Sequence, residues 1–143
     1  MHGSAMRWAL VGMVVLGVVA QAQPVPRELE RRTSQFFKLL MAGEIERAYQ
    51  QLAAGNPQRD SLWLEQLCER TRQLQRRHGL PLGWELLRAE WHGKALLRLE
   101  YVEYYDDLPV LWELLFYRSP RRGWLLLQLR MEGRPEMLLR KAE

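Results

Sequence analysis

The hydrophobic pattern of this chain changes period once, and the change lies at His78-Gly79-Leu80-Pro81. Before this break, apolar residues recur every three or four positions, as on one face of an α-helix. After it they alternate, as in a half-buried β-strand. Helices followed by strands are typical of an α+β domain, with the helices on one face of an antiparallel sheet. We therefore expect helices over about 27–78 and a curved sheet over about 83–141.

Three helices are expected in the first half because glycine and proline interrupt the apolar stripes twice. Pro26 suits a first helical turn, and Asp60 or Ser61 can cap free backbone amides. The expected helices run from Pro26 to Gly43, from Glu44 to Gly55-Asn56-Pro57, and from Asp60 or Ser61 toward Arg77.

Cys68 is the only cysteine of the chain and falls on the apolar stripe of the third expected helix. An intramolecular disulfide is therefore impossible. We expect Cys68 to act as a small buried hydrophobic residue. An intermolecular disulfide or a reactive thiol is the alternative.

Four strands are expected in the second half, joined by connections too short for a parallel crossover, so the sheet should be an antiparallel meander. They run over Trp84–Trp91, Ala95–Tyr105, Val110–Arg118 and Trp124–Met131, with a short fifth strand over Met137–Arg140. Pairing Trp91 with Lys94, Tyr105 with Val110 and Arg118 with Trp124 carries side-chain parity through the sheet, provided that no bulge intervenes.

Parity divides the strand residues between two faces. The face expected to meet the helices offers a set of pocket candidates: Trp84, Arg88, Tyr101, Tyr105, Trp112, Phe116 and Gln128. The opposite face holds an unexpectedly apolar set: Leu111, Leu115, Tyr117, Leu125, Leu127 and Leu129. A sheet wet on one side should be polar there. We expect a second copy of the chain to cover this face, with the fifth strand and C-terminal tail as the alternative.

The N-terminus has the build of a secretory signal peptide. Arg7 precedes an apolar run from Trp8 to Ala20, and the small-x-small triplet Ala20-Gln21-Ala22 suits the peptidase. We expect cleavage after Ala22, an uncleaved anchor being the alternative. The product would be one domain over 23–143, located in the periplasm or secreted.

Charge and motifs argue against several function classes. The net charge of +4 becomes +3 once residues 1–22, with one arginine and no acid, are removed. Basic residues are not interleaved with aromatic ones on a polar face, so we expect no nucleic-acid partner. Neither metal-ligand spacing nor a nucleophile motif is present, and we predict no cofactor and no metal. Glu90 and Glu103 have inward parity but lie toward strand ends, without an acid partner.

Three segments resemble the nuclear transport factor 2-like, cystatin-like superfamily of α+β cones. They are Phe36-Phe37-Lys38-Leu39-Leu40-Met41-Ala42-Gly43-Glu44 with Ala48-Tyr49, the third expected helix, and Trp112-Glu113-Leu114-Leu115-Phe116-Tyr117-Arg118 with Gly123-Trp124. The resemblance extends to small secreted bacterial members of unknown function. It implies helices and a curved sheet around a conical pocket, with a dimer on the outer face. Its motifs are structural and carry no chemistry.

The favoured hypothesis is a non-enzymatic binding or interaction module that uses the cone or the outer face for an apolar ligand or a protein. One alternative is a small pocket enzyme acting on a hydrophobic substrate, with Arg88 and Tyr101 or Tyr105 polarising an oxygen. A structural dimerisation domain with a filled core is the other.

Overall fold

The computed structural model describes residues 23–57 and 60–133. Three helices, α1 (Arg27–Met41), α2 (Ile45–Leu52) and α3 (Ser61–His78), precede four strands, β1 (Gly83–His92), β2 (Leu96–Tyr104), β3 (Pro109–Ser119) and β4 (Gly123–Glu132). The strands form one antiparallel sheet in the order β1-β2-β3-β4. The predicted α+β meander is confirmed. The predicted signal peptide, 1–22, and the predicted fifth strand, Met137–Arg140, lie outside the described residues.

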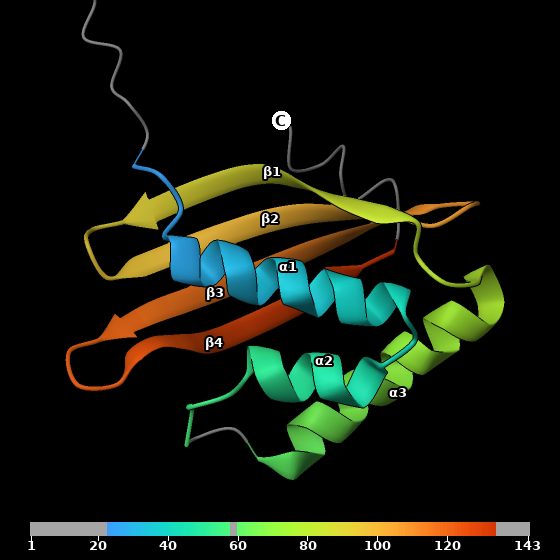
Figure 1. Ribbon diagram of the computed structural model, residues 1–143, viewed down its shortest axis with the longest axis horizontal. Coiled ribbons are helices and arrows are strands. Elements are labelled where there is room, and N and C mark those ends of the chain that lie inside the picture. Colours follow the sequence, from blue (N-terminus) through green and yellow to red (C-terminus); the bar gives the residue numbers. More distant parts are fainter. Residues whose placement is uncertain (1–22, 58–59, 134–143) are drawn as a thin grey trace, which may run out of the picture.

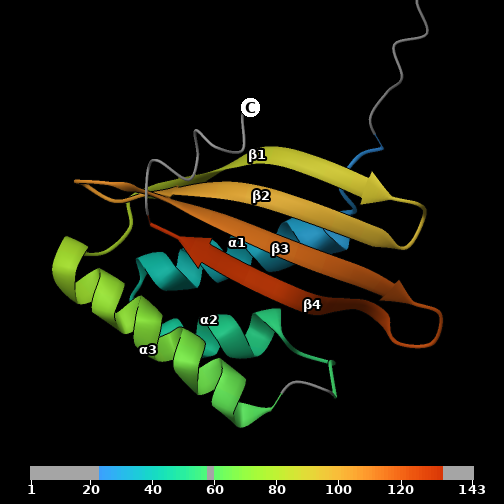
Figure 2. The same ribbon diagram turned by 180° about the vertical axis from the view of Figure 1, so that it is seen from behind.

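The helices occupy one face of the sheet and leave the other without a helix (Figures 1 and 2). We call these the helix side and the outer face. Helix α1 crosses the helix side of the sheet, α2 lies next to α1, and α3 packs beside α2 (Figure 1). No helix among residues 23–57 and 60–133 is long and apolar enough to cross a membrane.

Helix α1 carries the main apolar stripe that the sequence predicts. Leu29, Thr33, Phe37 and Leu40 are at most 1% exposed, at the three- and four-residue spacings that put side chains on one helix face. Helix α3 begins where Asp60 accepts a hydrogen bond from the backbone amide of Trp63 at 2.7 Å, which satisfies one free donor of the first turn.

Two β-bulges correct the predicted parity. In β1 the pairing shifts between Leu86, which faces Tyr101, and Arg88, which faces Glu100. A bulge inserts one unpaired residue, so every side chain beyond it changes face. Arg88 pairs with Glu100 and lies on the outer face, so its prediction as a pocket residue is wrong because the β1–β2 turn sets Trp91 against Leu97 instead of Lys94. Glu90, which pairs with Arg98, lies there too.

The second bulge lies between β3 and β4, where Phe116 pairs with Leu126 but Leu115 pairs with Gln128. Gln128 is consequently exposed on the outer face and not in the predicted pocket. Leu129 pairs with Leu114 and is buried in the core, which corrects its prediction as a dimer-face residue. Both corrections have the same cause, an inserted residue that parity counting assumed to be absent.

One of the three predicted turn pairings is observed, and the other two are shifted in register. Arg118 pairs with Trp124, as predicted. Val110 pairs with Glu103 instead of Tyr105, a shift of two residues that preserves the faces. Trp91 pairs with Leu97 instead of Lys94, a shift of three residues. That odd shift exchanges the faces, and the β1 bulge exchanges them back, so Trp84 still lies on the helix side.

Candidate functional site

The interior predicted as a pocket is occupied by aromatic side chains. Trp112 and Phe116 are both 0% exposed. The Trp112 ring lies 5.3 Å from Phe36 and 6.0 Å from Phe37 between centroids, edge to face in both cases. Trp84 stacks on Phe37 at 5.7 Å. Trp112 and Phe116 therefore belong to the core, and the partly buried Trp84 packs against it.

Tyr101, a fourth predicted pocket residue, joins the sheet to α1. Its hydroxyl donates to Thr33 Oγ1 at 2.9 Å, and Thr33 Oγ1 donates to the Leu29 carbonyl oxygen at 2.9 Å. Burial raises the pKa of Tyr101. A buried hydroxyl that is bonded in this way is a structural link, since neither its proton nor its lone pair is presented to solvent.

Glu103 is an acid inside the hydrophobic core, 0% exposed. The Trp112 indole Nε1 donates to Glu103 Oε1 at 3.2 Å. The Oε2 atom and the Tyr105 hydroxyl are buried, and no described residue hydrogen-bonds either of them. Burial raises the pKa of Glu103 to about 7, although the nearby Tyr105 and Trp112 groups lower it in part.

Tyr105, the fifth predicted pocket residue on the helix side, is also buried, and burial together with the Glu103 charge raises its pKa. Glu103 is 0% and Tyr105 5% exposed, and the Tyr105 hydroxyl is itself buried. Arg88 stands on the other face of the sheet, where its guanidinium donates to Glu90 at 2.7 Å. The residues predicted for a pocket enzyme therefore do not lie together: Tyr101 and Tyr105 are on the helix side, and Arg88 is on the outer face.

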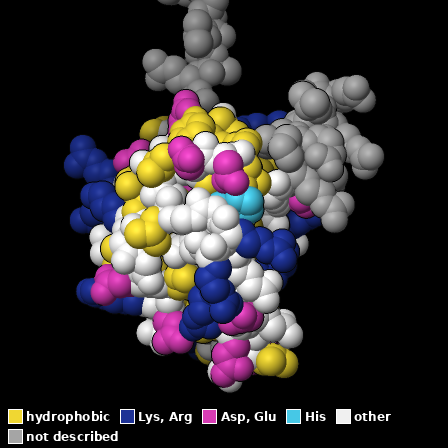
Figure 3. All heavy atoms as spheres, turned by 90° about the vertical axis from the view of Figure 1, so that its right-hand side faces the viewer, with side chains coloured by type: hydrophobic (Ala, Val, Ile, Leu, Met, Phe, Trp, Pro, Cys, Tyr) yellow, Lys and Arg dark blue, Asp and Glu magenta, His cyan; other side chains and the backbone are white. Residues whose placement is uncertain are grey.

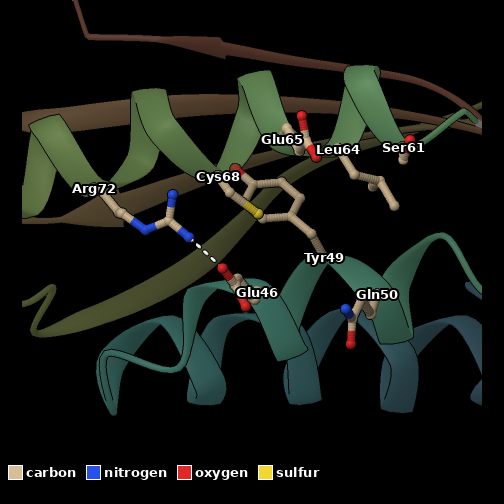
Figure 4. A pocket seen from close by; sticks show the side chains of 8 residues that line it. All are labelled: Glu46, Tyr49, Gln50, Ser61, Leu64, Glu65, Cys68 and Arg72. Atoms are coloured by element: carbon tan, nitrogen blue, oxygen red, sulfur yellow. Dashed lines mark hydrogen bonds and ion pairs between the residues drawn. The ribbon is translucent and has the colours of Figure 1, made fainter.

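A cleft of about 290 Å³ lies between α2 and α3 (Figure 4). Tyr49, Leu64 and Cys68 form its apolar part, and an ion pair between Arg72 and Glu46 closes one end. The remaining lining residues are Gln50, Ser61 and Glu65. Nothing in the sequence indicated this cleft, because it depends on how two helices pack.

Cys68 is buried, as the sequence predicts. Burial raises the pKa of its thiol, with Arg72 acting in the opposite direction. A raised thiol pKa reduces the thiolate fraction, and the thiolate is the nucleophile. The cleft therefore holds a weakly reactive sulfur.

The predicted dimer face is largely covered within one chain. Leu111 is 4% and Leu125 8% exposed, whereas Leu127 is 36% exposed. Leu115 and Tyr117 are half-buried. Between them runs a charged row in which Glu113 lies 3.3 Å from Arg98 Nε and 3.8 Å from Arg130 Nη1.

Large exposed apolar side chains gather instead at β1. We define the β1 margin as the set Leu80, Leu82, Leu86, Leu87 and Tyr104, which are 41–65% exposed. Tyr104 belongs to β2 but pairs with Gly83. Figure 3 shows hydrophobic side chains gathered at the top of this end of the molecule, where Figure 1 places β1. The sequence analysis missed this surface because it treated the β1 leucines by parity alone.

No group of three potential metal-ligating side chains occurs within the described residues. His78 Nδ1 contacts the Asp107 carboxylate at 2.7 Å, which joins the end of α3 to the loop between β2 and β3.

Comparisons with known proteins assign no family. No family model matches the chain, and no curated protein matches it. Among solved structures, the chain is similar to one described as "Structure of Bdellovibrio bacteriovorus Bd1075", with 7% identity and a TM-score of 0.44. The match covers 76% of this chain and 40% of that chain. A similarity this low does not identify the superfamily, and the α+β assignment therefore depends on the chain's own elements.

Proposed function

We propose that this protein is an exported, non-enzymatic interaction module of the nuclear transport factor 2-like, cystatin-like type that binds another polypeptide through the β1 margin. Export is inferred from the N-terminal pattern and the superfamily from the three sequence segments described above. The single observation that carries the proposal is that large apolar side chains are exposed beside β1, while the interior positions are filled.

The filled interior favours a surface function. Five interior side chains are 0% exposed: Leu97, Leu99, Trp112, Leu114 and Phe116. A small-molecule site is normally a concavity of several hundred cubic ångströms with a few convergent polar groups. On the helix side, the polar groups Thr33 and Tyr101 satisfy each other, and Glu103 is sealed from solvent.

The surface supports a polypeptide partner for two reasons. Large apolar groups that lie together on a surface typically mark interaction sites. Leu82 is 65%, Leu80 50% and Leu87 49% exposed, and they cluster within eight residues of sequence. These side chains lie in β1 or just before it, and β1 is an edge strand of the sheet. An edge strand offers unpaired backbone groups to a partner.

Site-specific photo-cross-linking tests the proposal. The full chain, with its leader, would carry a photoreactive phenylalanine analogue at Leu82 or at Leu87 in a bacterial host. Gln51, exposed on α2, is the control position. We expect a discrete polypeptide adduct from the β1 positions and none from Gln51.

Native mass spectrometry of the exported protein supplies the opposing test. A stoichiometric small molecule retained by the protein, together with no adduct from Leu82 or Leu87, would contradict the proposal. It would favour a ligand function, for which the cleft between α2 and α3 offers a space.

A further inference from the structure

The two edges of the sheet are treated differently by the fold. The carbonyl oxygens of Trp124 and Leu126 in edge strand β4 accept hydrogen bonds from Arg32 at 2.9 Å and Asn56 at 2.8 Å. Side chains from the helical half thus cover β4. Within the described residues, no side chain hydrogen-bonds the backbone of β1, the other edge strand. The sheet can therefore be extended at β1.

The bulge restricts which strand can be added. On either side of it, the pairings with β2 assign each β1 residue to a face. Trp84 and Leu86 lie on the helix side before the bulge, and Ala89 and Trp91 lie there after it. Glu85, which pairs with Val102, and Arg88, which pairs with Glu100, lie on the outer face. The order of faces is therefore symmetric about a point between Leu86 and Leu87.

This symmetry suits a second copy of the same strand. Opposite residues of an antiparallel pair must lie on the same face. In a regular strand, a twofold axis between two consecutive residues would set residues of opposite faces against each other. The extra residue, Leu87, removes that conflict. Over 83–90, and apart from the central pair formed by Leu86 and the unpaired Leu87, the axis matches helix-side residues with helix-side residues and outer residues with outer residues.

The side chains brought together by this axis are complementary. Glu85 of one copy faces Arg88 of the other, and the twofold repeats this opposite-charge pair. Leu86 faces Leu87 between the two charge pairs, and both leucines are exposed in the single chain. An isologous interface must be self-complementary in this sense. A polypeptide of unrelated sequence has no reason to carry both the matching charge order and the matching irregularity.

We propose that the partner of the β1 margin is a second copy of this chain, joined by antiparallel pairing of the two β1 strands about an axis between Leu86 and Leu87. The result is a continuous eight-stranded sheet with all helices on one side. This inference rests on the proposed function and names its partner.

Charge exchange tests the register. Analytical ultracentrifugation of the exported protein should show a reversible dimer. Glu85→Arg alone, or Arg88→Glu alone, replaces both attractive pairs with like charges, and each should raise the dimer dissociation constant about tenfold. The double variant E85R/R88E restores opposite charges and should recover the original constant. Glu44→Arg, an exposed change near the start of α2, is the matched control and should change nothing.

Several results would overturn this assignment. A monomer at every concentration, a dimer insensitive to the single reversals, or a double variant that fails to recover would each refute the β1 pairing. Circular dichroism verifies that each variant folds. Adducts from Leu87 to a different protein would refute the second copy and leave the proposed function standing. A monomer with no adduct from Leu82 or Leu87 would refute both.

Discussion

Replacing Glu103 by glutamine should make the protein more stable above neutral pH. The carboxyl group is 0% exposed, and only one of its oxygens has a hydrogen-bond partner among the described residues. Glutamine has nearly the same shape and no charge. Its oxygen can accept the Trp112 indole proton in place of Glu103 Oε1, and its amide nitrogen can donate toward the Tyr105 hydroxyl.

The size of this stability gain follows from the pKa of Glu103, which is raised from 4.5 to about 7 in the folded protein. The folded state therefore binds more protons than the unfolded state between pH 4.5 and 7. Stability falls as the pH rises through this window. Each pKa unit corresponds to about 1.4 kcal/mol, so the carboxylate destabilises the folded state at pH 8 by about 3 kcal/mol relative to its protonated form.

Urea unfolding followed by tryptophan fluorescence, from pH 4.5 to pH 8 at one protein concentration, measures this effect. The difference in unfolding free energy between Glu103→Gln and the wild type should grow with pH in favour of the variant. The other carboxyl groups are the same in both proteins, so their titration cancels when the two unfolding free energies are subtracted. Glu65→Gln, an exposed change on α3, is the control and should show no such growth. Parallel curves for Glu103→Gln and the wild type would refute the reasoning.

Three further outcomes test the fold and the cleft. Phe116→Ala, at a position 0% exposed, should lower the unfolding free energy by about 3–5 kcal/mol in urea titrations, and a loss below 1 kcal/mol would deny that the interior is close-packed. Asp60→Ala removes the side-chain acceptor of the Trp63 amide and should cost about 1 kcal/mol in the same titration, with Asp60→Asn close to wild type. Cys68 should react slowly with iodoacetamide in the native protein and rapidly in urea, as measured by mass spectrometry. Equal rates would contradict its burial and raised thiol pKa.

The secondary structure could be predicted because its signals are local. The three-and-four spacing of the buried α1 residues depends only on nearby residues, as do the breaks at Gly43 and Gly79. Those buried residues include Leu29, Thr33, Phe36 and Leu40. The alternation of the second half likewise predicts the four strands, and their short connections fix the meander. The local spacing of apolar and polar side chains is therefore enough to predict where each element lies and whether it is a helix or a strand.

The tertiary structure decided which face some side chains reached and which surfaces stayed open. A bulge changes the face of every later residue, and whether one forms depends on packing across the sheet. Gln128 and Leu129 were misplaced for that reason, and Arg88 was misplaced because the turn between β1 and β2 shifts the pairing of Trp91 by three residues. Glu103 had inward parity in the sequence, but its complete burial and raised pKa come from the helices above it.

The open edge at β1 was decided in the same way. Arg32 and Asn56 are ordinary polar residues in the sequence, and only the fold brings them to the carbonyls of β4, more than sixty residues away. The alternating pattern of the sequence predicts two edge strands, β1 and β4, and does not show which of them has a covered backbone. Among the described residues, contacts distant along the chain cover β4 and leave the backbone of β1 without a side-chain partner, because long-range hydrogen bonds depend on where the helices come to lie.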